Sequence, residues 1–157
     1  MKAVKQGSAR WQGGIKDGEG HVSTQSGALS NQPYGFNTRF EDEAGTNPEE
    51  LIGAAHASCF SMALSKELGE VKGDGRPLIE TKADVTLESQ GEGFAVTKSH
   101  LTVLVNHAGA DEAEVREAAE GAKANCPISK LLTADITMDL TVNTQSRPQE
   151  EEPRGAA

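Results

Sequence analysis

Cys59 and Cys126 are the residues of this 157-residue chain whose types and surroundings most clearly point to chemistry. Cys59 lies in the uncharged stretch LIGAAHASCF, which is typical of a buried helix. Its neighbours at helical spacing are mostly small and apolar, and burial among such side chains raises the pKa of a thiol and lowers its reactivity. Cys59 is therefore either a packing residue, as most buried cysteines are, or a nucleophile that receives a positive charge from outside its helix.

Arg39, between two aromatic residues in GFNTRF, is the candidate for that charge. A guanidinium stays charged when partly buried, and a carboxylate from Glu49 or Glu50 could fix its direction. Glu49 and Cys59 are ten residues apart in the same predicted helix, which corresponds to about 15 Å along the axis. One arginine can hardly bridge that distance. If Arg39 contacts both groups, they come from different copies of the helix, which predicts a homodimer with sites across its interface.

Cys126 precedes Pro127 and is placed to cap a short helical turn, a position that favours a thiolate. A thiol of low pKa with a second thiol nearby is an arrangement suited to peroxide reduction. One thiol attacks the O–O bond and becomes a sulfenic acid, and the other condenses with it to form a disulfide. An external dithiol then regenerates both thiols by exchange.

Other interpretations of the same residues stay open. Cys59 and Cys126 could be packing residues of a stress-induced protein that binds a lipid-like ligand in an apolar pocket. Arg39 could be an ordinary surface residue, and Glu49 could serve only the helix dipole. His56 and Cys59, three residues apart, could bind a metal, but zinc usually needs three or four protein ligands and the other histidines show no ligand spacing. We therefore expect no metal, and we expect His56 to be a core or supporting residue rather than a base.

The composition is that of a soluble acidic protein, with a formal net charge of −9 and a mean hydropathy of −0.51. An acidic chain without a basic cluster repels phosphate backbones and anionic lipids, so neither nucleic acid nor a membrane is an expected partner. The sequence has no signal-peptide pattern, and its longest uncharged run is shorter than the roughly 20 apolar residues that span a bilayer. We expect a cytoplasmic protein, in which two cysteines are reduced or redox-active.

The order of predicted elements indicates an α+β fold. We expect one domain over residues 1–143 and an acidic, disordered tail over 144–157. The expected elements are strands over 2–12 and 21–25, a long structured loop over 27–47, a helix over 48–68, a strand hairpin over 78–88 and 94–105, a helix over 111–124, a helical turn over 126–132 and a strand over 134–142.

Three segments, QPYGFNTRF, TNPEELIGAAHASCFSMAL and NCPIS, strongly resemble the OsmC/Ohr family, and most closely its osmotically inducible protein C branch. The likeness runs from about Trp11 to Val142, which is nearly the whole chain apart from the tail. The resemblance implies an intertwined α+β homodimer in which antiparallel sheets wrap around two central helices. It also implies active sites shared between the subunits, in agreement with the distance argument.

The resemblance further implies a thiol-dependent peroxidase that reduces organic hydroperoxides and uses no metal, haem or flavin. Matched by motif, Cys59 corresponds to the peroxidatic cysteine and Cys126 to the resolving cysteine. Arg39 corresponds to the arginine that holds the thiolate, and Glu49, rather than Glu50, to its carboxylate partner. The implied partners are an organic hydroperoxide as substrate and an external dithiol, of the lipoyl type, as reductant.

Overall fold

The computed structural model describes residues 1–41 and 43–145, whose helices and strands confirm the predicted α+β class. The chain divides after Leu51 into two compact units, which we call unit 1 and unit 2. The predicted acidic tail, 144–157, lies outside the described residues except for its first two positions. Within the described part, no helix is both long enough and apolar enough to cross a membrane.

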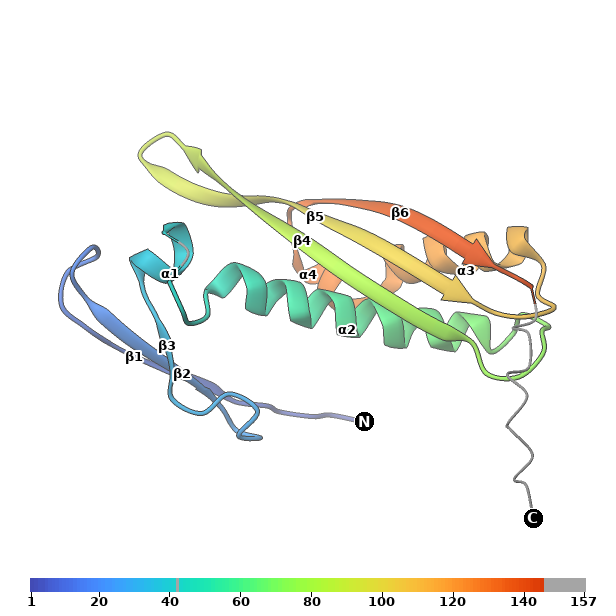
Figure 1. Ribbon diagram of the computed structural model, residues 1–157, viewed down its shortest axis with the longest axis horizontal. Helices are drawn as coiled ribbons and strands as arrows, with labels where there is room; N and C mark the ends of the chain where they lie inside the picture. Colours follow the sequence, from blue (N-terminus) through green and yellow to red (C-terminus); the bar gives the residue numbers. More distant parts are fainter. Residues whose placement is uncertain (42, 146–157) are drawn as a thin grey trace, which may run out of the picture. The chain divides into compact units, whose positions relative to one another are not determined.

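Unit 1 contains a three-stranded antiparallel sheet in the order β1-β2-β3, followed by a short helix, α1 (Figure 1). The bounds are Gly7–Gln12 for β1, Glu19–Thr24 for β2, Gln32–Tyr34 for β3 and Phe36–Phe40 for α1. Gly20 in the central strand lies between Trp11 and Tyr34, whose ring centroids are 5.5 Å apart. A Cβ atom at Gly20 would be 2.5 Å from the Tyr34 ring, so the glycine makes room for the two aromatic side chains.

The prediction of one long loop over 27–47 is wrong, because this segment contains β3 and α1. β3 has only three residues at the edge of its sheet, where a proline such as Pro33 is tolerated. α1 is stabilised by Thr38, whose hydroxyl accepts a hydrogen bond from the N–H of Gly35 at 2.9 Å and lies 2.8 Å from the carbonyl oxygen of Thr46. Neither element is long enough to produce a periodic pattern in the sequence.

The helix α2, Pro48–Leu68, has the bounds that the sequence predicts. Asn47 caps its start, since the side-chain oxygen accepts a hydrogen bond from the N–H of Glu50 at 2.9 Å. Pro48 occupies the first helical position, where its missing N–H costs nothing. The helix ends immediately before Gly69, as predicted.

Unit 2 contains a second three-stranded sheet, in the order β4-β5-β6, and the helices α3 and α4 (Figure 1). The bounds are Leu78–Gln90 for β4, Gly93–Asn106 for β5, Glu112–Asn125 for α3, Pro127–Leu131 for α4 and Asp135–Asn143 for β6. The predicted β4–β5 hairpin is confirmed as an antiparallel pair. The expectation of antiparallel sheets is wrong for β6, which pairs with β5 in parallel. The reason is the connection, because a crossover through α3 and α4 returns the chain to the end of the sheet where β5 began.

The hydrophobic core of unit 2 lies between the sheet and the helices α2 and α3. The central strand β5 directs alternate side chains, Leu101, Val103 and Val105, into this core. The helices contribute the other fully buried apolar residues, which are Phe60, Leu64 and Leu68 from α2 and Val115, Ala119 and Ala122 from α3. α2 also comes close to β4, because a Cβ atom at Gly53 would be 2.9 Å from the carbonyl oxygen of Ala83.

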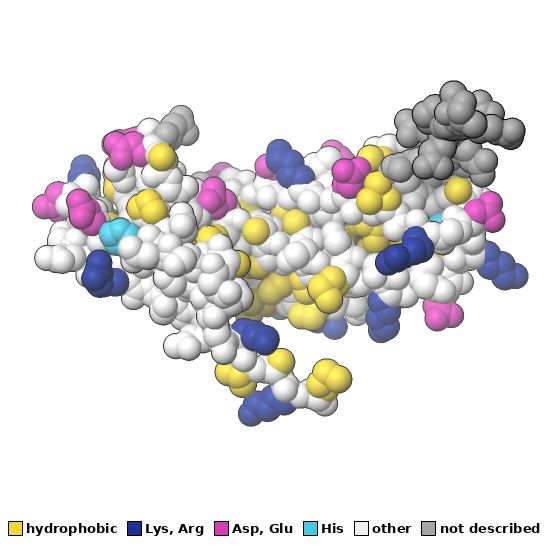
Figure 2. All heavy atoms as spheres, turned by 60° about the horizontal axis from the view of Figure 1, so that its bottom comes forward, with side chains coloured by type: hydrophobic (Ala, Val, Ile, Leu, Met, Phe, Trp, Pro, Cys, Tyr) yellow, Lys and Arg dark blue, Asp and Glu magenta, His cyan; other side chains and the backbone are white. Residues whose placement is uncertain are grey.

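The opposite side of α2 is exposed in the single chain, although its uncharged sequence predicts burial on all sides. Ala54, Ala55 and Ser58 are exposed on this side, and the side chain of Met62 is 75% exposed. Figure 2 shows hydrophobic side chains gathered over the middle of one face, in the region of α2. We call this surface of α2, made by Ala54, Ala55, Ser58 and Met62, the outer α2 face.

Substitution of Leu64 tests the packing of α2 on the sheet of unit 2. Because its side chain is fully buried in the core of unit 2, Leu64→Ala should lower the free energy of unfolding by about 2–5 kcal/mol. The neighbouring exposed substitution Ser65→Ala should change it by no more than about 0.5 kcal/mol. Urea denaturation of both variants provides the measurement, and equal effects would contradict this account of the core.

Candidate active site

The two cysteines of the chain lie beside each other in unit 2. Cys59 is half-buried on α2, and Cys126 is fully buried at the N-cap position of α4. Both are free thiols, and each lies close enough to the other to affect its ionisation. Residues 67 positions apart in the sequence (126 − 59) are thus brought together by the packing of α4 against α2. The arrangement allows a sulfenic acid on one sulfur to be attacked by the other.

The surroundings of the two thiols shift their pKa values in opposite directions. Burial, and then the hydrogen bond to Cys126, raises the pKa of Cys59. Burial also acts to raise the pKa of Cys126, but the backbone N–H of Ser129, the Cys59 thiol and the Ser129 hydroxyl outweigh it, so that the pKa is lowered. The Cys126 side chain makes no cap hydrogen bond to the described backbone of α4, so the N–H of Ser129 acts on the sulfur by electrostatic proximity.

Unit 2 alone therefore favours a proton on Cys59 and a negative charge on Cys126. The sequence predicts the second effect from the position of Cys126 before Pro127. The first effect agrees with the inference that Cys59 needs a cation from elsewhere if it is to be a nucleophile. The two ionisations are linked, because a negative charge on one sulfur disfavours a negative charge on the other.

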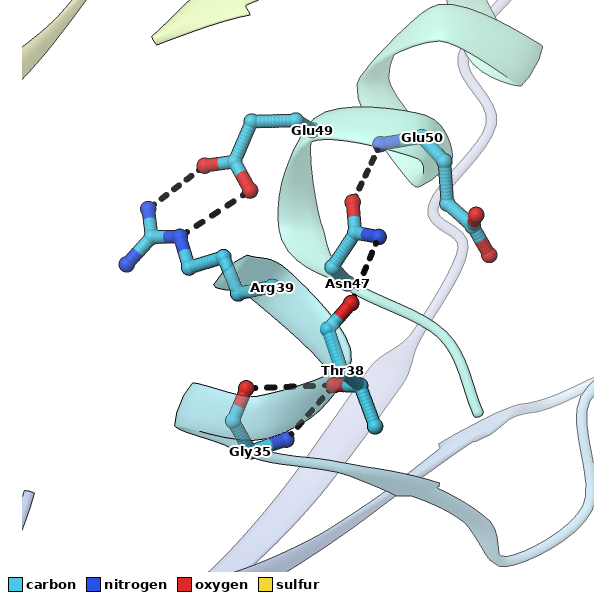
Figure 3. A network of polar contacts seen from close by, with 6 residues as sticks. All are labelled: Gly35, Thr38, Arg39, Asn47, Glu49 and Glu50. Atoms are coloured by element: carbon cyan, nitrogen blue, oxygen red, sulfur yellow. Dashed lines mark hydrogen bonds and ion pairs between the residues drawn. The ribbon is translucent and has the colours of Figure 1, made fainter. Parts of the chain in front are cut away.

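Arg39 and Glu49 form a bidentate ion pair within unit 1 (Figure 3). Nε of Arg39 donates to Oε2 of Glu49 at 3.0 Å, and Nη2 donates to Oε1 at 2.5 Å. The Glu49 side chain is only 13% exposed and that of Arg39 is 30% exposed, so the pair is partly shielded from water. Because the pair uses Nε and Nη2, Nη1 projects away from the carboxylate.

Spacing alone leaves Glu49 and Glu50 as alternatives for this pairing, the family resemblance favours Glu49, and the structure pairs Arg39 with Glu49. The Glu50 carboxylate instead accepts a hydrogen bond from the Thr46 hydroxyl at 2.6 Å. The Asn47 side chain caps α2 and also reaches the carbonyl oxygen of Thr38 at 3.4 Å, which ties α1 to the start of α2 (Figure 3). Local hydrogen bonds of unit 1 therefore hold Arg39 and Glu49 in place.

His56 is the buried polar residue whose connections the sequence does not reveal. Its Nδ1 lies 2.7 Å from the hydroxyl of Ser99 on β5, and its Nε2 lies 2.9 Å from the hydroxyl of Ser129 on α4. Ser99 and Ser129 are 43 and 73 residues away in the sequence, so no local spacing signals these contacts. Both ring nitrogens already have partners, and among the described residues no three His, Cys, Asp or Glu side chains are grouped to hold a metal ion.

Fold and site together define a class, namely a small α+β protein with two interacting thiols in one unit and a carboxylate-bound arginine in the other. Comparison with known proteins makes this assignment specific. The OsmC-like protein family matches residues 40–141. The peroxiredoxin OsmC of Escherichia coli K12 is 56% identical over 144 residues, covering 92% of this chain and 100% of that protein. This chain belongs to the OsmC family, as its motifs predict.

More distant relatives share the fold. The organic hydroperoxide resistance protein OhrB of Bacillus subtilis is 29% identical over 121 residues, covering 77% of this chain and 87% of that protein. Its crystal structure matches with a TM-score of 0.61 over 87% of this chain and 98% of that chain. An OsmC-like protein from Vibrio cholerae, only 16% identical, matches with a TM-score of 0.66 over 89% of this chain and 100% of that chain, which supports the fold alone.

His56 gives this site a measurable dependence on pH. Burial lowers the pKa of His56, so the unfolded chain, in which a histidine has a pKa of about 6.5, binds a proton more readily than the folded chain. The free energy of unfolding should therefore decrease as the pH falls below about 6.5. In His56→Asn the contribution of this histidine to the pH dependence should be absent. The carboxylates contribute to the pH dependence of the wild type and the variant alike. Urea denaturation at several pH values measures the difference, and equal pH dependence in the two proteins would refute it.

Proposed function

We propose that this protein is a cytoplasmic thiol peroxidase that reduces organic hydroperoxides to alcohols, with Cys59 as the peroxidatic residue and Cys126 as the resolving residue. The observation that carries the proposal is the proximity of two free thiols in unit 2, which pack in the same core cluster and affect each other's ionisation. The predicted class agrees with the name of the relative that is 56% identical, a peroxiredoxin. The small apolar residues around Cys59 on α2 favour an organic peroxide over hydrogen peroxide.

The reaction proceeds in three balanced steps. The Cys59 thiolate attacks one peroxide oxygen, the O–O bond breaks, and the departing alkoxide takes a proton to become the alcohol. Cys59 is left as a sulfenic acid, S–OH. The Cys126 sulfur then attacks the Cys59 sulfur, which forms the disulfide and releases the hydroxyl with the thiol proton as water. An external dithiol, of the lipoyl type, reduces the disulfide by exchange and becomes oxidised itself.

The Arg39–Glu49 pair is our candidate for the positive charge that Cys59 lacks in unit 2. Partial burial raises the pKa of the Cys59 thiol, and a guanidinium beside it would favour the thiolate. Glu49 holds Arg39 through Nε and Nη2, so the remaining nitrogen, Nη1, is the one we assign to the Cys59 thiolate. A bidentate carboxylate fixes the guanidinium plane, which gives the thiolate contact a defined direction.

We assign the arginine of each site to the partner subunit of a homodimer. Glu49 and Cys59 are ten residues apart in α2, or about 15 Å along the helix axis, and Arg39 is already held by Glu49. The outer α2 face is exposed in the single chain and is made of small and apolar residues, which allow close packing of a second copy. Such packing would bury α2 on all sides, as its uncharged sequence predicts.

Substitution of each cysteine separates the two chemical steps. Cys59→Ser should abolish consumption of cumene hydroperoxide, since no sulfur can form the sulfenic acid. Cys126→Ser should permit one turnover and then accumulate the Cys59 sulfenic acid, because no second thiol resolves it. Mass spectrometry after one equivalent of peroxide should show loss of two hydrogens in the wild type and gain of one oxygen in Cys126→Ser. Equal peroxide consumption by the wild type and Cys59→Ser would refute the peroxidase.

Mixing two inactive variants tests the shared site. In a heterodimer of Arg39→Ala and Cys59→Ser, one site combines the intact Cys59 of the first chain with the intact Arg39 of the second. Random exchange of subunits should therefore restore about a quarter of the wild-type activity. If Arg39 instead serves the Cys59 of its own chain, both sites of the heterodimer are defective and the mixture stays inactive. Peroxide consumption before and after subunit exchange distinguishes the two arrangements.

A further inference from the structure

A buried line of polar groups leads from the sheet of unit 2 to Ser129, which is the third residue of α4, the helix whose N-cap residue is Cys126. Ser99 on β5 and His56 on α2 are fully buried, and Ser129 on α4 is 9% exposed. The Ser99 hydroxyl contacts Nδ1 of His56, and Nε2 of His56 contacts the Ser129 hydroxyl. The Ser129 hydroxyl and backbone N–H in turn favour the thiolate form of Cys126. The peroxidase steps described above use none of these three side chains.

The number of protons along this line restricts the directions of its hydrogen bonds. A neutral imidazole carries one N–H, and each serine hydroxyl donates only one hydrogen. If the Ser129 hydroxyl donates to the Cys126 sulfur, its oxygen is left to accept from His56, which requires the proton on Nε2. Nδ1 is then an acceptor, and the Ser99 hydroxyl donates to it. If the proton is on Nδ1 instead, Ser129 must donate to Nε2, and Cys126 loses that donor.

The groups around His56 favour the neutral imidazole that this argument needs. Its polar contacts come from β5 and α4 and are both serine hydroxyls. The titratable groups that face the line are the two thiols, Cys59 from α2 and Cys126 at the start of α4. Burial lowers the pKa of His56, which keeps the ring uncharged at neutral pH.

We propose that His56 is a positioning residue: fixed by Ser99, it aims the Ser129 hydroxyl at Cys126 and prepares this thiol to attack the sulfenic acid. Ser99 holds the orientation of the His56 ring from its far side. The role in the attack rests on the proposed peroxidase function, whereas the effect on the ionisation of Cys126 does not. The hydrogen-bond line thus makes the resolving thiol depend on a serine in the central strand of the sheet.

The ionisation of Cys126 can be measured without any peroxide. In a Cys59→Ser background, Cys126 is the sole thiol, and its thiolate absorbance in the ultraviolet, followed against pH, gives its pKa. Adding Ser129→Ala should raise that pKa by about one unit. Ser99→Ala should raise it in the same direction, because the His56 ring loses the contact at Nδ1 that keeps Nε2 directed at Ser129. Ser99→Thr and Ser129→Thr keep the hydroxyl and should restore the original value.

Ser61→Ala is the matched control. Ser61 is also on α2, and its hydroxyl forms a partly buried hydrogen bond with Thr81 at 2.8 Å. It is not part of the Ser99–His56–Ser129 line. It should leave the Cys126 titration unchanged. The proposal would be overturned if the Cys126 pKa in Ser99→Ala equals that of the Cys59→Ser background. It would also be overturned if Ser61→Ala shifts this pKa as much as Ser99→Ala does. The threonine variants, which keep the buried hydrogen bonds, separate this result from a failure to fold.

Kinetics then test the link to the reaction. With Cys59 present, one equivalent of cumene hydroperoxide should form the sulfenic acid at the wild-type rate in Ser99→Ala, whereas disulfide formation at neutral pH should slow by up to about tenfold. This deficit should disappear at high pH, where Cys126 ionises without help. If the Cys126 pKa shifts in Ser99→Ala but neither the wild type nor any variant consumes peroxide, the peroxidase function is refuted and the proposed effect of His56 on Cys126 stands. If the wild type consumes peroxide but the Cys126 titration is the same in Ser99→Ala as in the background, the proposed role of His56 is refuted and the peroxidase function stands.

Discussion

Two thiols that contact each other inside an apolar core cannot both be ionised at low cost, and the remaining features of this site follow from that constraint. Unit 2 lowers the pKa of Cys126 and raises that of Cys59. A chain left to itself would thus hold its charge on the resolving sulfur. In the proposed site, the guanidinium of Arg39 would reverse this preference by stabilising a thiolate on Cys59.

α2 is the element on which this separation depends. Its first turn carries Glu49, which holds Arg39, and its middle carries Cys59 and His56. One side packs on its own sheet so closely that Gly53 has no room for a side chain. The outer α2 face presents only small and apolar groups. One helix thus carries Glu49, Cys59 and His56. One side of it packs on the sheet of unit 2, and the outer α2 face is exposed.

Much of this arrangement could be predicted from the sequence because local signals specify it. The cap at Asn47, the acidic first turn and Gly69 define α2, and alternation defines the β4–β5 hairpin. Motif resemblance and helical distance identified the four residues of the proposed site. β3 and α1 were missed because three and five residues are too few for a period, and the parallel pairing of β6 depends on a crossover that no local pattern encodes. The Ser99–His56–Ser129 line joins residues from three distant elements, so only the fold reveals it.

The packing of Trp11 on Tyr34 across Gly20 has a further consequence for how the protein can be observed. These are the single tryptophan and the single tyrosine of the chain, and both belong to unit 1. Intrinsic fluorescence therefore originates entirely from the unit that carries Arg39, with the donor and acceptor rings in contact. An emission change on oxidation or reduction would consequently report a response of the arginine-bearing unit rather than of the sulfurs themselves. The single tryptophan and the single tyrosine thus lie in unit 1, whereas both cysteines lie in unit 2.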